Sequence, residues 1–267
     1  MTSLTHDSPE LARAYDRLSD SQFEGGKRLV GRLGLKAGER VLDIGCGTGR
    51  LARWMAEIVG PDGVVGIDPL VDRVEVARAG AAGISFQVGQ AEDLGAFGGE
   101  SFDAVCMSAV FHWVSDKPRA LAEVRRVLRP GGRLGLTTLP RDLRPSSTTT
   151  LVCAEILSRD PYIGRVQPAG LALAQVGNLL SDLVALVLEA HLEVLELLVV
   201  QRTQTFSSGE DAIDFLQSSS FGNFLRLVPD DLRASFRRDI AGAFEARRGP
   251  GGISLNDHGT LLVAARG

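Results

Sequence analysis

The sequence predicts an α/β protein with a mostly parallel sheet, helices on both faces of that sheet, and a helical cap inserted after the fifth and sixth strands. Strand and helix patterns alternate through the first half of the chain, the order that gives parallel strands joined by right-handed crossovers. A glycine-rich loop lies between the first of these strands and the helix that follows it. After residue 140 the pattern becomes irregular, as expected for inserted segments.

The elements follow in order from apolar periodicity and from Gly and Pro punctuation. Strands are expected near residues 40–45, 63–68, 84–88, 102–107, 132–138, 193–202 and 259–265. Helices are expected near residues 9–18, 21–33, 49–59, 70–79, 116–128 and 171–190, with two or three amphipathic helices over 207–248. Asp116 is the expected N-cap of its helix, with Pro118 in the first turn. Pro130-Gly131-Gly132 is expected to form the turn into the fifth strand.

The glycine-rich loop and two nearby acids indicate the kind of ligand that the protein binds. Glycines 45, 47 and 49 have the spacing G-x-G-x-G, whereas a dinucleotide loop has G-x-G-x-x-G. Asp43 precedes them and would repel a pyrophosphate but suit an ammonium group. Asp68 closes the next strand, where an acid accepts hydrogen bonds from ribose hydroxyls. An amino acid joined to a ribose without phosphate describes S-adenosylmethionine.

Five ordered features resemble the cofactor half of class I S-adenosylmethionine-dependent methyltransferases, between about Tyr15 and Thr138. They are Val41–Gly49, Gly66-Ile67-Asp68, Gly89–Leu94, Ser101–Val105 and Leu128–Gly132. The segment is most similar to the group that includes the ubiquinone/menaquinone-pathway and trans-aconitate methyltransferases. The resemblance implies a Rossmann-like sheet of seven strands whose last strand lies antiparallel between strands five and six.

The resemblance also implies the residues of the cofactor site. Asp43 and the loop Gly45, Cys46, Gly47 and Gly49 would hold the amino-acid part of S-adenosylmethionine. The remaining candidates are Asp68 at the ribose, Pro69, Gln90, Ala91 and Glu92 near the adenine, Ser108 after the fourth strand, and Tyr15 in a segment that closes over the site. Gln90 departs from the family, which usually has Asp there, but its carbonyl accepts the same hydrogen bond from the adenine amino group.

Candidates for the acceptor side are fewer. His112 would act as a general base if the acceptor loses a proton, or else it orients the loop. Trp113, Arg141 and Arg144 are candidates for substrate binding, with packing or solvated loop positions as the alternatives. We identify no metal-ligand pattern, and three dispersed cysteines suggest neither a disulfide framework nor a zinc site.

Composition limits the class of protein. The 267 residues are 44% hydrophobic and 23% charged with a net charge of −4, which gives no general attraction to nucleic acid. Met107–Val110 also lack the Asn/Asp-Pro-Pro-aromatic tetrad of nucleic-acid amine methyltransferases. No signal peptide or membrane span is apparent, so we expect a cytoplasmic protein without membrane insertion.

We therefore expect methyl transfer to a small, rather apolar metabolite, with oxygen preferred as acceptor, then carbon, then nitrogen. The alternative is a cyclase or binding protein that keeps the cofactor and transfers nothing. The expected organisation is a cofactor-binding core with N-terminal helices (1–139), a cap segment with the sixth strand (140–205), a helical cap (206–250) and the last strand (251–267). Residues 179–200 fit either the core or a homodimer contact, so the sequence leaves the oligomeric state open.

Overall fold

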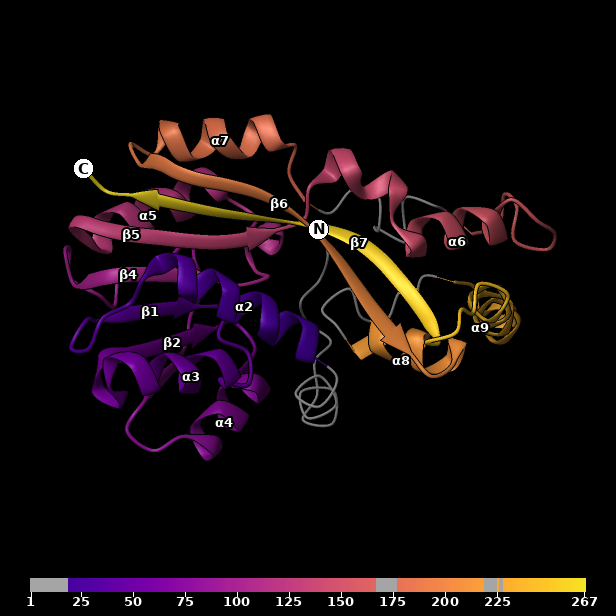
Figure 1. Cartoon of the computed structure of the whole chain (residues 1–267), viewed down its shortest axis with the longest axis horizontal. Coiled ribbons are helices and arrows are strands. Elements are labelled where there is room, and N and C mark those ends of the chain that lie inside the picture. Colours follow the sequence, from indigo (N-terminus) through magenta and orange to yellow (C-terminus); the bar gives the residue numbers. More distant parts are fainter. Residues whose placement is uncertain (1–18, 167–176, 219–224, 226–227) are drawn as a thin grey trace. The chain divides into compact units, whose positions relative to one another are not determined.

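The computed structural model of the chain describes residues 19–166, 177–218, 225 and 228–267 (Figure 1). It divides into two compact units. Unit 1 draws on Met1–Leu139, Gly177–Val199 and Thr260–Gly267, and unit 2 on Pro140–Val176 and Val200–Gly259. Each unit encloses a hydrophobic core of its own.

A seven-stranded sheet runs in the order β3-β2-β1-β4-β5-β7-β6. Its strands are β1 (Val41–Ile44), β2 (Val64–Asp68), β3 (Ser85–Val88), β4 (Phe102–Met107), β5 (Leu128–Thr138), β6 (Glu193–Phe206) and β7 (Ile253–Ala265). Strands β1 to β5 pair in parallel, and β7 is antiparallel to β5. The predicted insertion of the last strand between the fifth and sixth is therefore confirmed.

Helices cover both faces of the sheet, as predicted. On one face α2 (Asp20–Leu33), α3 (Arg50–Val59) and α4 (Val71–Gly80) bury their apolar side chains. On the other face lie α5 (Lys117–Val127) and α7 (Leu180–Glu189). Two short 3-10 helices, η1 (Pro61–Gly63) and η2 (Phe111–Trp113), lie in the connections.

The start of α5 agrees with its sequence signal, whereas the start of β5 does not. The Asp116 side chain accepts a hydrogen bond from the Arg119 N–H at 3.0 Å, and Pro118 lies in the first turn. Strand β5 begins at Leu128, before the predicted Pro-Gly-Gly turn rather than after it. Leu128 pairs with Phe102 and Arg133 with Ala104, so the turn residues form an irregularity within the strand, and Gly131 has φ 74°.

The structure describes only part of one predicted helix and none of another. Of the predicted helix over 171–190, Leu180–Glu189 form α7 and residues 177–179 are not helical, while residues 171–176 lie outside the described residues. The predicted helix over 9–18 also lies outside the described residues. Strand β6 continues to Phe206 instead of residue 202, and β7 begins at Ile253 instead of near residue 259.

Unit 2 contains the 3-10 helix η3 (Arg141–Ser146) and the helices α6 (Thr148–Leu157), α8 (Gly209–Ser218) and α9 (Asp230–Glu245). The predicted apolar stripe of α9 is confirmed, since its members Leu232, Phe236, Ile240 and Phe244 are all buried. Helix α6 replaces the irregular segment that we predicted. Its threonine run disfavours a helix, but Ser147 caps the N-terminus and Val152 and Ile156 enter the core of unit 2, so packing decides.

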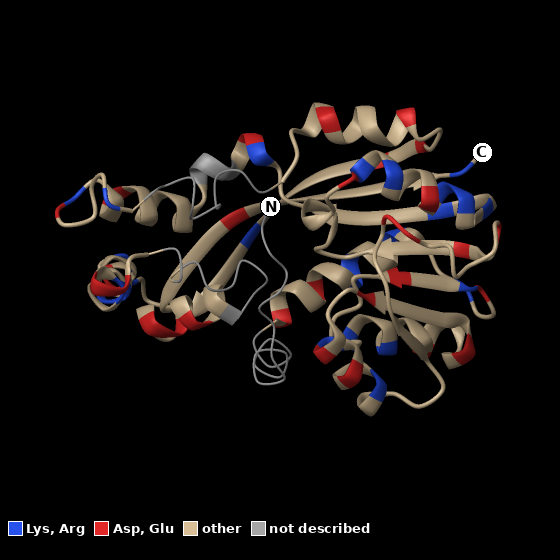
Figure 2. Cartoon of the chain, turned by 180° about the vertical axis from the view of Figure 1, so that it is seen from behind, with Lys and Arg blue, Asp and Glu red and all other residues tan. Residues whose placement is uncertain are grey.

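The charged residues of both signs are interspersed over the helices (Figure 2). Cys46, Cys106 and Cys153 are buried free thiols. Among the helices that the structure describes, none combines the length and the apolar character of a membrane span. Within the same residues, no group of three or more His, Cys, Asp or Glu side chains is placed to hold a metal ion.

Candidate functional site

The glycine loop connects β1 to α3 at the carboxyl end of the sheet. The backbone N–H groups of Gly45 and Cys46 both donate to the Ile67 carbonyl, at 2.7 and 2.9 Å, which fixes the start of the loop to β2. Gly49 has φ 80° and caps α3 without a side-chain partner. The first N–H groups of α3 therefore point into the loop, and they favour polar or anionic atoms of a ligand.

The three loop glycines all have positive φ but differ in the space that surrounds them. A Cβ on Gly45 would lie 2.2 Å from Cγ2 of Val110, and a Cβ on Gly49 would lie 2.9 Å from Phe86. Both positions are therefore filled by the protein itself. Gly47 has φ 54° and no heavy atom within 4 Å of its notional Cβ. Only at Gly47 does the loop leave its backbone open to a ligand.

Asp68 connects the loop to β2. Its Oδ2 accepts from the Gly47 N–H at 3.0 Å, and its Oδ1 accepts from the Leu70 N–H at 2.9 Å. The side chain is 5% exposed. A carboxylate at this position is the type of group that accepts hydrogen bonds from ligand hydroxyl groups.

Asp43 is a buried carboxyl group with an unused oxygen. It is 2% exposed, and its Oδ2 has no hydrogen-bond partner. Burial, followed by the nearby charge of Asp68, raises the pKa of Asp43 from 3.8 to about 7. A cationic ligand group beside these two carboxyls would supply the missing partner and favour the ionised form of Asp43.

Cys46 also lies in this loop and is 8% exposed. Burial, and then the charges of Asp43 and Asp68, raise the pKa of its thiol well above the ordinary value. The thiol is therefore protonated at neutral pH and acts as a small packing group rather than a nucleophile.

The segment after β3 contains three predicted cofactor residues. Gln90 is exposed and forms an isolated antiparallel bridge with Asp93, while Ala91 is 4% exposed. Glu92 uses its Oε1 to accept from the N–H groups of Ser115 and Asp116, at 2.8 and 3.2 Å. In the structure Glu92 thus binds the backbone just before α5. Its contact with a cofactor stays a prediction.

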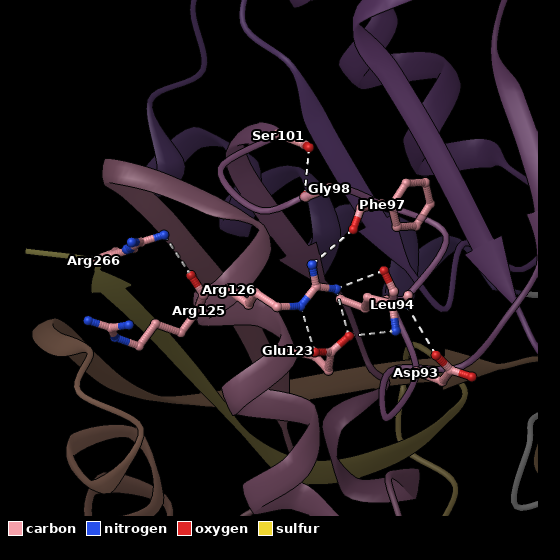
Figure 3. A network of polar contacts seen from close by, with 10 residues as sticks. Asp93, Leu94, Phe97, Gly98, Ser101, Glu123, Arg125, Arg126 and Arg266 are labelled. Atoms are coloured by element: carbon pink, nitrogen blue, oxygen red, sulfur yellow. Dashed lines mark hydrogen bonds and ion pairs between the residues drawn. The ribbon is translucent and has the colours of Figure 1, made fainter.

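Figure 3 shows how the far end of the same segment is held. The Arg126 guanidinium on α5 donates to the carbonyls of Leu94 and Phe97, both at 2.9 Å, and to both oxygens of Glu123. Glu123 in turn accepts from the Leu94 N–H at 2.9 Å. This network, together with Glu92, fastens the segment after β3 to both ends of α5.

Replacing Arg126 by Ala is expected to lower the free energy of unfolding by about 1 to 2 kcal/mol, because two loop carbonyls and the Glu123 carboxylate lose their donors. Urea unfolding monitored by circular dichroism measures the change. The matched control is Arg125→Ala, because Arg125 makes one long hydrogen bond, 3.4 Å to the His191 carbonyl. Equal losses in the two variants would show that the network does not stabilise this segment.

The turn after β4 places the next candidates. Ser108 is half-buried, and its Oγ would lie 3.1 Å from a Cβ on Gly26 of α2. His112 and Trp113 belong to η2, with ring centroids 5.0 Å apart and an interplanar angle of 51°. Phe111 is fully buried and anchors this short helix. His112 is therefore held on a packed turn that follows the strand, but its part in catalysis remains a prediction.

The structure brings together Asp43, the loop residues 45–49 and Asp68. Tyr15 falls outside the described residues. Arg141 is an exposed residue of η3 in unit 2, and Arg144 belongs to the same 3-10 helix. Pro69 is exposed directly after Asp68.

Sequence reasoning missed two residues beside the loop. Val110 fills the space at Gly45, and the Thr137 hydroxyl accepts a hydrogen bond from the Ala109 N–H at 2.7 Å. Neither residue belongs to a recognisable motif, since a Val in a turn and a Thr in a strand are ordinary. The close approach at Gly45 would have been apparent only from the packing of β4 beside β1.

The geometry fits a ligand with a cationic amino-acid group and neighbouring hydroxyls. Gly47 leaves backbone space, Asp43 has an unpartnered carboxylate oxygen, and Asp68 places a second buried carboxyl group at the loop. Two buried carboxyls at one loop would disfavour a ligand that brings a pyrophosphate to the same place.

Comparisons with known proteins identify a methyltransferase domain in this chain. A family model described as a methyltransferase domain matches residues 42–136. An uncharacterized methyltransferase of Mycobacterium tuberculosis is 44% identical over 124 residues, which cover 46% of this chain and 49% of that protein. A demethylmenaquinone methyltransferase of Symbiobacterium thermophilum is 38% identical over 136 residues, covering 46% and 54%. The chain thus spans about half the length of the curated relatives it matches.

Among solved structures, the YcgJ protein of Bacillus subtilis superposes with a TM-score of 0.62 at 23% identity. The match covers 91% of this chain and 98% of that one. This likeness extends beyond the matched domain and concerns the fold.

Proposed function

Because residues 42–136 make this chain a member of the class I S-adenosylmethionine-dependent methyltransferase family, we propose that it methylates a small metabolite. The observation that carries the proposal is the buried, unpartnered carboxylate oxygen of Asp43 beside the open backbone at Gly47. When bound, S-adenosylmethionine supplies an activated methyl group on a sulfonium.

Residues of unit 1 would hold that cofactor. Asp43 accepts from the ammonium group, Gly47 lets the methionine part lie against the loop, and Asp68 accepts from the ribose hydroxyls. The exposed Gln90 side chain offers its carbonyl to the adenine amino group. For an oxygen acceptor, our first preference before carbon and nitrogen, His112 is the proposed proton acceptor.

The acceptor class is proposed on narrower support. The phenylalanines of residues 206–250 give little support, because Phe236 and Phe244 are buried in the core of unit 2 and Phe215 is buried as well. Phe221 and Phe224 lie outside the described residues. The proposal of an apolar acceptor is therefore supported by the relative named as a demethylmenaquinone methyltransferase. We propose that Trp113, Arg141 and Arg144 contribute to acceptor binding.

Methyl-labelled S-adenosylmethionine tests the function directly. The purified protein is incubated with the labelled cofactor and a metabolite extract, and mass spectrometry follows both S-adenosylhomocysteine and the labelled product. A labelled small molecule is the expected result and identifies the acceptor atom. Label found only in protein or nucleic acid would contradict the proposal, and binding without any turnover would favour a cofactor-retaining protein that transfers nothing.

Asp68→Asn is expected to weaken the binding of S-adenosylhomocysteine about tenfold or more, as measured by isothermal titration calorimetry. An amide has one acceptor oxygen where Asp68 uses two, so either the Gly47 or the Leu70 N–H loses its partner. Glu75→Gln is the matched control, since Glu75 is an exposed carboxylate on the next helix. Unchanged affinity in Asp68→Asn would show that Asp68, at the end of β2, does not bind the ribose.

A further inference from the structure

The turn between β4 and η2 contains a strained residue. Ala109 has φ 58°, a left-handed conformation that a residue with a Cβ adopts at a cost in free energy. It follows β4 by two positions and precedes η2 by two. Residues in such conformations persist only where the surrounding contacts hold them, so a specific contact at Ala109 is required.

That contact comes from the neighbouring strand. The Ala109 N–H donates to the Thr137 hydroxyl oxygen at 2.7 Å. Strands β4 and β5 are parallel here, with Met107 opposite Leu136, so Thr137 lies one step further along β5. A side chain, rather than a ladder carbonyl, therefore satisfies the Ala109 N–H.

The conformation of Ala109 determines where Val110 lies. The Val110 side chain occupies the space that a Cβ on Gly45 would need, with Cγ2 2.2 Å from that notional atom. Its carbonyl also accepts from the Trp113 N–H at 2.8 Å and so begins η2. Val110 thus contacts the glycine loop on one side and starts the helix that carries His112 on the other.

We propose that Thr137 is a positioning residue for the cofactor loop: its hydroxyl holds Ala109 in the left-handed conformation and thereby places Val110 against Gly45. The inference rests on the proposed function, because the loop that Thr137 supports is the proposed cofactor site. Thr137 acts through the turn, so its removal should loosen the loop rather than delete a ligand contact.

Four variants test this role. Thr137→Val keeps the shape of the side chain and removes the acceptor, whereas Thr137→Ser keeps the hydroxyl. Ala109→Gly removes the cost of the left-handed conformation, and the fourth variant combines Ala109→Gly with Thr137→Val. Calorimetric titration with S-adenosylhomocysteine measures affinity, and amide hydrogen exchange of residues 43–49 and 108–113 in the ligand-free protein measures loop order.

Thr137→Val is expected to weaken binding about three- to tenfold and to speed exchange in both segments. Thr137→Ser is expected to bind within about twofold of the wild type because it keeps the hydroxyl acceptor. The double variant is expected to do the same because glycine removes the cost of the left-handed conformation that the hydroxyl offsets. If Thr137 acted only within β5, Ala109→Gly would not restore the affinity of Thr137→Val. A double variant that binds as weakly as Thr137→Val therefore overturns the inference. Equal affinity and equal exchange in Thr137→Val and Thr137→Ser also overturn it.

The two proposals fail in different ways. If the wild type does not bind S-adenosylhomocysteine, the proposed function is wrong, and hydrogen exchange then decides the role of Thr137 alone. If the wild type binds and only the Thr137 pattern is absent, the positioning role is wrong while the proposed function stands.

Discussion

Replacing Asp43 by Asn is expected to raise the free energy of unfolding of the cofactor-free protein at pH 8 by about 2 to 4 kcal/mol. The pKa of Asp43 is raised from 3.8 to about 7, first by burial and then by the charge of Asp68. At pH 8 the folded protein therefore holds an ionised carboxyl group with an unpartnered oxygen. Asn fills nearly the same volume without that charge.

The sign of the pH dependence follows from the direction of the shift. Between about pH 4 and pH 7 the folded state binds more protons at Asp43 than the unfolded state, so stability falls as pH rises through this window. Asp43→Asn should lose this contribution. The difference between variant and wild type is expected to be small near pH 4 and to grow until about pH 7. Urea unfolding at a series of pH values measures it.

Asp103→Asn serves as a control of opposite sign. Burial raises the pKa of Asp103, but the Arg40 N–H and the Arg129 guanidinium more than offset this and hold it below 3.8. Removing that carboxylate should therefore lower stability at neutral pH. If Asp43→Asn shows the same pH profile as the wild type, Asp43 does not carry the proton that we assign to it. The stabilised variant should also bind S-adenosylhomocysteine more weakly, because it lacks the charge for the ammonium group.

Substituting Gly45 and Gly47 by Ala is expected to separate folding from binding. Gly45→Ala should lower the free energy of unfolding by about 2 to 4 kcal/mol, because the new Cβ would overlap Val110 and φ is 73°. Gly47→Ala meets no atom within 4 Å, so it should cost only about 1 kcal/mol from its positive φ. Thermal and urea unfolding measure both values.

The effects on affinity should follow the opposite order. After correction for the folded fraction of each variant, Gly47→Ala should weaken binding more than Gly45→Ala. Gly47→Ala places a methyl group where we propose that the methionine part of the cofactor binds, so we expect at least about tenfold weaker binding of S-adenosylhomocysteine. Gly25→Ala is the control, since its added Cβ also meets no atom within 4 Å and its φ is not positive. Similar stability losses in Gly45→Ala and Gly47→Ala would contradict the packing described for this loop.

The sequence predicts those features of this protein in which a residue type meets a requirement set by its immediate neighbours along the chain. Glycine at a tight loop and an acid at the end of β2 have local causes, so the sequence indicates where Asp43, Gly47 and Asp68 meet. The alternation of strands and helices then gives the parallel order of β1 to β5. Local chemistry also predicts the cap at Asp116, because the Arg119 N–H that it satisfies is three residues away.

Contacts between distant segments explain what was missed. Helix α6 forms although its threonines disfavour it, because Val152 and Ile156 are buried in the core of unit 2. Glu92 accepts from the Ser115 N–H just before α5, a contact over 23 residues, whereas the motif resemblance assigns Glu92 to the cofactor site. Thr137 and Ala109 are 28 residues apart and meet only because β4 and β5 are adjacent.

The position of β7 has a consequence for the order in which the protein can assemble. This strand follows the other six along the chain, yet it lies between β5 and β6. During synthesis β5 therefore emerges long before its outer neighbour exists, and β6 has no partner in the sheet until β7 has been made. Until then one edge of β5 is open to pairing with other chains. Nascent chains that stop short of Ile253 should consequently expose this edge, whereas chains that contain β7 can cover it.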